Sequence, residues 1–158
     1  MHRLTIAGWV LILSLVACGS KYLTGTQVED TPENRVIAEL VERYRQAVER
    51  RDVPALKEMI SRRYFSNAGT TADNSDDYGY EMVEQKLLPL LQSDVKSVQF
   101  SIYLRKIEFA GDHAMANFEY SRKFYYVDAG KDRWLNKTDF GRLTFAREEG
   151  TWRIIDGL

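Results

Sequence analysis

The sequence is poor in the residues that give many small extracellular proteins their stability or chemistry. It contains one cysteine, Cys18, and two histidines, so an intrachain disulfide and a Cys/His metal cluster are both excluded. It has no Gly-rich phosphate-binding loop and no Ser nucleophile elbow. The formal net charge is −1 at pH 7, which argues against a nucleic-acid-binding surface. The chain therefore carries no linear signature of a catalytic activity.

Long apolar runs are also scarce, and the one that is present is too short for a transmembrane helix. Residues 4–16 are almost entirely apolar, follow Arg3 and are interrupted by Gly8 and Ser14. A membrane-spanning helix needs about 20 apolar residues, whereas a signal peptide needs a positive start and an apolar stretch of about 7–15 residues. The run predicts a signal peptide over residues 1–17. An uncleaved anchor and ordinary secretion are the alternatives.

The end of this run resembles the lipobox of bacterial lipoproteins. It reads Leu15, Val16, Ala17 and Cys18, an apolar residue and two smaller ones before the cysteine. The resemblance implies cleavage before Cys18, lipid attachment to its sulfur and a place in the bacterial cell envelope. In such proteins an Asp directly after the cysteine commonly signals retention in the inner membrane. This chain has Gly19 at that position, which favours the outer membrane, with the domain facing the periplasm. Two or more acyl chains hold a protein stably at a bilayer, so the membrane is the first expected partner.

The remaining chain has the size of one domain. Residues 18–31 are polar and predict a lipidated N-terminus with a flexible tether. Residues 32–158 are then one folded domain. Its first part has the apolar spacing of helices and its second part that of strands, which predicts the α+β class.

Three helices are expected at the start of this domain. Thr31 can cap the first helix and Asp52 the second, which ends near residue 60. The third covers about residues 80–92, where Pro89 should kink or shorten it. Apolar residues of the first helix recur every three or four positions, at Val36, Ile37, Leu40, Val41, Tyr44 and Val48.

From Val95 onward the apolar period changes to two, which predicts strands. The first strand changes parity after Leu104, so a bulge is expected near Arg105 and Lys106. Three further strands are expected over residues 114–126, 134–147 and 151–156. Short turns join them, so consecutive strands should pair antiparallel.

This order of elements resembles the NTF2-like superfamily, within it the SnoaL/DUF4440 type. The resemblance lies in residues 41–56 (VERYRQAVERRDVPAL), an amphipathic helix followed by an Asp-capped turn, and in residues 150–155 (GTWRII), similar to the closing strand. It implies a cone of three N-terminal helices packed in a bent antiparallel β-sheet of about four strands, with a conical pocket. The superfamily includes isomerases, epoxide hydrolases and dehydratases, but also many binding modules and parts of secretion systems, so the fold does not give the function.

A cofactor-free isomerase or hydrolase is the catalytic hypothesis. Asp139 shares strand parity with Leu143 and Phe145, so its carboxylate could face the cone. Apolar surroundings disfavour the charged form and would tune it as a general base. The hydrogen-bond donor would be one of three tyrosines: Tyr120, Tyr44 or Tyr64.

The alternative gives Asp139 a structural role on the outer face of the sheet. There it would pair with Arg122 or Arg142. His113 lies beside a predicted turn, at the rim of the sheet, and is not expected to reach a bound substrate.

An acidic, irregular loop over residues 66–80 raises the question of calcium. Asp73, Ser75, Asp77, Glu81 and Glu84 follow the spacing of ligands in a calcium-binding loop. The position that needs Gly for a sharp turn holds Tyr78, so we expect no metal. In the alternative, Asp76 or Asp77 caps the third helix. No cofactor is expected.

Aromatic residues of the second strand are candidates for a ligand pocket or a partner surface. The candidates are Phe118, Phe124 and Tyr126. Phe124, Tyr125 and Tyr126 are adjacent, so they must point to both faces of the strand. Core filling is the alternative.

The sequence favours a membrane-anchored, non-catalytic binding module for a protein partner or a small apolar ligand. An alternative function, as a structural part of an envelope or secretion assembly, remains open. So does the formation of a homodimer.

Overall fold

The computed structural model describes residues 21–67 and 74–158. Its helices and strands, in chain order, are α1 (Pro32–Arg50), α2 (Val53–Met59), β1 (Phe65–Ser66), β2 (Tyr78–Gly79), α3 (Tyr80–Met82), the π-helix η1 (Val83–Leu87), α4 (Leu88–Ser93), β3 (Val95–Ala110), β4 (His113–Asp128), β5 (Lys131–Glu148) and β6 (Thr151–Asp156). The predicted order of helices and strands is confirmed. The signal segment, Cys18 and Asp73 lie outside the described residues.

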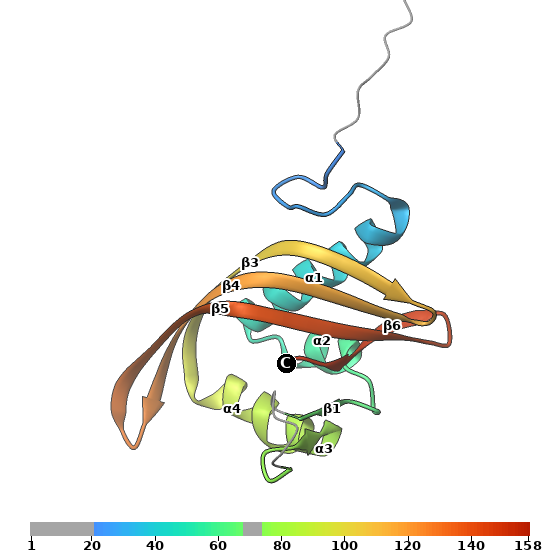
Figure 1. Cartoon of the computed structure of the whole chain (residues 1–158). Helices are drawn as coiled ribbons and strands as arrows, with labels where there is room; N and C mark the ends of the chain where they lie inside the picture. The colour runs from blue at the N-terminus through green and yellow to red at the C-terminus, as the bar shows by residue number, and fades with distance from the viewer. Residues whose placement is uncertain (1–20, 68–73) are drawn as a thin grey trace, which may run out of the picture.

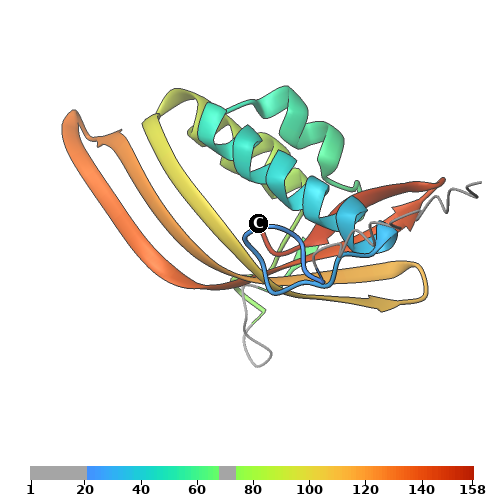
Figure 2. The same ribbon diagram turned by 90° about the horizontal axis from the view of Figure 1, so that it is seen from above.

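One antiparallel sheet curves around the long helix α1. Its strand order is β3-β4-β5-β6, so each strand pairs with its sequence neighbour, and the sheet forms a bent trough that holds α1 (Figures 1 and 2). The register of β3 against β4 shifts between Leu104 and Lys106, which confirms the predicted bulge. β6 pairs only with the end of β5, over residues 144–148, and therefore leaves most of β5 as a free edge. The predicted α+β fold is confirmed.

Both predicted helix caps are present. The Thr31 side chain accepts a hydrogen bond from Asn34 N at 3.2 Å, and that of Asp52 accepts one from Ala55 N at 3.1 Å. The buried face of α1 consists of Ile37, Val41, Tyr44, Ala47 and Val48. Val36, which was expected in this stripe, is 45% exposed because it lies at the edge of the face that meets the sheet.

The third helical segment is less regular than predicted. Its middle part is the π-helix η1, in which Leu88 N donates to Val83 O, and Pro89 follows at the start of α4. Proline cannot donate a backbone hydrogen bond, and a wider turn just before it accommodates that loss. The expectation that Asp76 or Asp77 caps this segment is wrong: its N-cap is Gly79, which has no capping side chain, since β2 lies between the acidic residues and the helix.

Residues 21–30 form a docked N-terminal segment, so the prediction of a flexible tether over residues 18–31 does not hold for them. Tyr22 and Glu29 form a β-bridge, and Gln27 N donates to Leu104 O of β3 at 3.1 Å. Val28 is only 3% exposed. A single buried valine and these backbone bonds fix a stretch whose composition is that of a linker.

The core fills the space between α1 and the concave face of the sheet. The largest side chains that are almost fully buried are Phe145, Ile37, Leu143, Ile154, Val41 and Val83. Trp152 of the closing strand packs partly buried against this core, as expected, and its ring lies 6.2 Å from that of Phe109. Across the described residues, no helix is long and apolar enough to cross a membrane.

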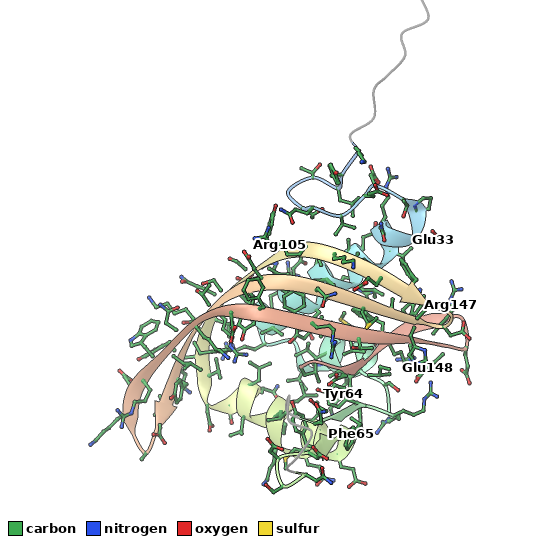
Figure 3. All side chains as sticks on the ribbon, viewed as in Figure 1. Glu33, Tyr64, Phe65, Arg105, Arg147 and Glu148 are labelled. Atoms are coloured by element: carbon green, nitrogen blue, oxygen red, sulfur yellow. The ribbon has the colours of Figure 1, made fainter. Side chains whose placement is uncertain are left out.

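A buried hydroxyl links the helical layer to the end of the sheet. Glu148 lies where β5 turns towards β6 (Figure 3). Its carboxylate accepts a hydrogen bond from the fully buried Ser61 hydroxyl at 2.6 Å and pairs with Arg63 at 2.7 Å. The hydrogen bond from Ser61, followed by that from Arg63, lowers the pKa of Glu148.

Glu148→Gln tests this link through the pH dependence of stability. A carboxyl group with a lowered pKa in the folded state stabilises the protein above its unfolded pKa of about 4.3, and this contribution is lost as pH falls through the folded pKa. We expect the free energy of unfolding of wild type to exceed that of Glu148→Gln most above about pH 5. The difference should shrink towards pH 3 in urea titrations. Glu149→Gln, in the adjacent exposed turn, is the matched control; an equal pH dependence in both variants would contradict the role of Ser61.

Candidate functional site

A pocket opens between α1 and the concave face of the sheet. We call it the cone pocket; its volume is about 620 Å³. Helix α1 contributes Tyr44, β3 contributes Phe100 and β5 contributes Gly141. The lining residues of β4 are Asn117, Phe118, Tyr120 and Arg122. The pocket is thus built from elements that are up to about a hundred residues apart in sequence.

Aromatic rings form the wall of the cone pocket. The ring centroids of Tyr44 and Phe100 are 6.0 Å apart, and Tyr120 lies 6.2 Å from both Phe100 and Phe118. All three contacts have the edge-to-face geometry that aromatic pairs favour. Gly141 makes this arrangement possible, because a Cβ there would lie 2.6 Å from Cε2 of Phe118. Phe118 therefore has the position that the sequence predicted for a pocket residue.

The structure brings two of the three candidate tyrosines into the pocket. Tyr44 and Tyr120 line it, whereas Tyr64 lies just outside, where its hydroxyl accepts a hydrogen bond from Leu158 N at 3.1 Å. Burial raises the pKa of Tyr44 to about 12, although the positive charge of Arg122 opposes this. Burial also raises the pKa of Tyr64. Both phenols are therefore neutral at physiological pH and able to donate hydrogen bonds.

Asp139 lies on the concave side but lacks the environment of a general base. It stands opposite Tyr120 in the register of β4 and β5, as its parity predicts. Its side chain is 48% exposed, and its carboxylate pairs with Lys137 at 2.9 Å and accepts from Phe140 N at 2.9 Å. The hydrogen bond from Lys137 lowers its pKa, in contrast to the raised value that the catalytic hypothesis requires. Its ion-pair partner is neither Arg122 nor Arg142.

Arg122 is the pocket residue that sequence reasoning missed. It was considered only as a partner for Asp139, yet it lines the pocket between two aromatic neighbours on its own strand. Its guanidinium carbon lies 5.3 Å from the ring centroid of Tyr120 and 5.7 Å from that of Phe124. The sequence did contain a signal for this pocket residue, because Arg122 is a cation between Tyr120 and Phe124 on the aromatic face of the strand.

The other two aromatic candidates line a different groove. Phe124 and Tyr126 border a groove of about 410 Å³ together with Leu87, Leu90 and Leu91. Tyr125 points to the opposite face, where it stacks on Trp134 with centroids 4.6 Å apart. This confirms that the adjacent aromatic residues point to both faces of the strand.

The acidic loop does not gather metal ligands in the part that the structure describes. No three His, Cys, Asp or Glu side chains of residues 21–67 and 74–158 come close enough to hold an ion. Glu84 is engaged instead by Lys57 and Arg62, both at 3.3 Å, and by the Tyr80 hydroxyl at 3.1 Å. His113 begins β4 and is exposed, as expected for a hairpin residue.

Comparisons with known proteins identify the fold alone. No protein-family model and no curated protein sequence matches the chain. Among solved structures, an NTF2-like protein of unknown function from Pseudomonas putida matches with a TM-score of 0.59 and 19% identity, over 81% of this chain and 85% of that one. An NTF2-like superfamily protein from Salmonella enterica serovar Typhimurium matches with a TM-score of 0.59 and 16% identity, over 78% and 86%. A proposed dehydratase of the NTF2-like family from Streptomyces avermitilis matches with a TM-score of 0.58 and 14% identity, over 80% and 95%. The chain therefore has the NTF2-like fold.

Proposed function

We propose that this protein is a non-catalytic binding module of the bacterial envelope whose cone pocket takes a small, largely apolar molecule. A lipid on Cys18 holds it at the outer membrane, facing the periplasm. The observation that carries the proposal is the cone pocket itself, a concave site of about 620 Å³ lined by six aromatic residues. Ligand sites are characteristically concave, and they combine aromatic surface with polar groups that fix the orientation of the ligand. A small molecule is thus favoured over a protein partner for this site.

The pocket supplies affinity through rings and orientation through hydroxyls. A flat apolar ligand would replace water against Phe100 and Phe118, at about 25 cal/mol for each Å² of apolar surface removed from water. The Tyr44 hydroxyl, kept neutral because burial raises its pKa, lies among these rings and can donate to a polar atom on the ligand. The Tyr120 hydroxyl is a second donor in the lining. The lowered pKa and exposure of Asp139 remove the observation on which an isomerase or hydrolase would rest.

Gly141→Leu tests the proposal by filling the pocket. Its side chain requires the space now occupied by the Phe118 ring, so that ring must move into the cavity. We expect the full chain, reconstituted in zwitterionic nanodiscs, to bind 2-naphthamide in equilibrium dialysis with a Kd on the order of 0.1–1 mM, the affinity usual for a ligand of this size. Binding by Gly141→Leu should be at least tenfold weaker.

Asp139→Asn is the matched control, because it changes the same strand two residues away without entering the pocket. It should bind 2-naphthamide as wild type does. The nanodisc surface is common to all variants, so partition into lipid cancels in the comparison. Equal uptake by wild type and Gly141→Leu would mean that the cone pocket is not the binding site. Circular dichroism establishes that the variants keep the native fold.

A further inference from the structure

We propose that the ligand of the cone pocket is a monocarboxylic acid on a flat apolar body, and that Arg122 is the residue that binds its carboxylate. This inference rests on the proposed function and specifies the chemical class of the ligand. It begins from one atom, the Nε of Arg122, which is buried and has no hydrogen-bond partner among the residues that the structure describes.

An unpaired buried donor on a cation is uncommon and calls for an explanation. The guanidinium has five N–H donors and no acceptor. None of the ion pairs within residues 21–67 and 74–158 involves Arg122 or Asp156, the acidic residue that also lines the pocket. Asp139, which pairs with Tyr120 in the register of the neighbouring strand, is held by Lys137. The positive charge at this end of the pocket is therefore left for a ligand.

The surroundings of Arg122 hold its guanidinium in one place. The rings of Tyr120 and Phe124 flank it on its own strand, and it stands opposite Phe100 in β3. Aromatic faces attract a guanidinium and restrict its movement. Such a planar, preorganised fork matches the two oxygens of a carboxylate, which it binds through two parallel hydrogen bonds.

The remaining pocket residues fit the rest of such a molecule. Phe100 and Phe118 provide apolar walls, and the neutral Tyr44 hydroxyl can donate to the same carboxylate or to a second polar atom. The charged residues of the pocket lining are Arg122, Arg142 and Asp156, whose charges sum to +1, which matches a monoanion better than a dianion. A neutral ligand would offer the guanidinium no charged acceptor, whereas a carboxylate supplies two oxygens to its N–H donors.

The test compares 2-naphthoate with 2-naphthamide, which share a ring system and differ in charge. With the full chain in zwitterionic nanodiscs, we expect naphthoate to bind about 10- to 100-fold more tightly than naphthamide, as a charged hydrogen-bonded pair usually contributes. Arg122→Met should abolish this preference, so that the ratio of the two dissociation constants falls to about one. Arg122→Lys, which keeps the charge without the planar fork, should retain part of it.

Lys123→Met is the matched control, since it removes the same charge from the next residue, whose ammonium lies over Trp134 and outside the pocket. It should keep the preference for naphthoate.

Equal binding of both probes to wild type would overturn this inference and leave the proposed function standing. A preference lost equally in Lys123→Met would overturn it too, because the effect would then come from overall charge. Failure of both probes to bind, or binding unaffected by Gly141→Leu, would overturn the proposed function itself.

Discussion

Replacing Phe145 by alanine is expected to lower the free energy of unfolding by about 3–5 kcal/mol, the usual cost of truncating a buried phenylalanine. Phe145 has no exposed surface, and its register partners Ala114 and Ile154 are also fully buried. The lost contacts would not be recovered, since three strands hold the walls of the resulting cavity in place. A loss of this size is a large part of the stability of an ordinary domain.

Phe140→Ala is the matched comparison, because Phe140 lies on the same strand and is 74% exposed. We expect it to change stability by less than about 0.5 kcal/mol. In thermal melts of the full chain, Phe145→Ala should unfold roughly 10–20 °C below wild type. If Phe145→Ala does not fold, Phe145→Leu should show a smaller loss of the same sign. Similar losses in Phe140→Ala and Phe145→Ala would contradict the burial that the fold assigns to the two residues.

The second large effect is expected at Cys18. On the proposed function, wild-type protein extracted from membranes has the mass of residues 18–158 plus acyl chains. Cys18→Ala removes the sulfur that carries the lipid, so we expect the unprocessed chain with no acyl mass. Intact mass spectrometry of both proteins measures this directly.

Ser20→Ala serves as the control for Cys18→Ala, since it alters a neighbouring residue and leaves the four lipobox residues unchanged. It should be processed and acylated as wild type is. An unmodified full-length mass for wild type would remove the lipid anchor from the proposed function. The cone pocket and its tests would be unaffected, because they depend only on the folded domain.

Features set by neighbouring residues were predictable from the sequence. The caps at Thr31 and Asp52 need only a side chain and a backbone N–H three residues later. The bulge at Arg105 was visible as a change in apolar parity within one strand. Each of these signals is contained in fewer than ten residues, so no knowledge of tertiary contacts was required.

Features set by distant contacts were not predictable. The docking of Val28 depends on the carbonyl of Leu104, which lies far along the chain and offers its hydrogen bond only once the sheet has formed. Asp139 was placed correctly by parity, but its charge state follows from Lys137 and from its exposure, and parity gives neither. The sequence shows Arg122 only as a cation within an aromatic face, and its place in a pocket depends on α1 and the three strands that enclose it.

The docked N-terminal segment limits how far the protein can reach. Its first residue, Lys21, is only three residues beyond Cys18. Three residues span at most about 11 Å whatever their conformation. A domain attached so closely to a lipid would move in two dimensions along the bilayer surface and would sample molecules at the level of the headgroups. The occupancy of its pocket would then depend on the concentration of the ligand in the membrane interface. A ligand that partitions into that layer would therefore occupy the pocket at a far lower total concentration than its affinity in solution indicates.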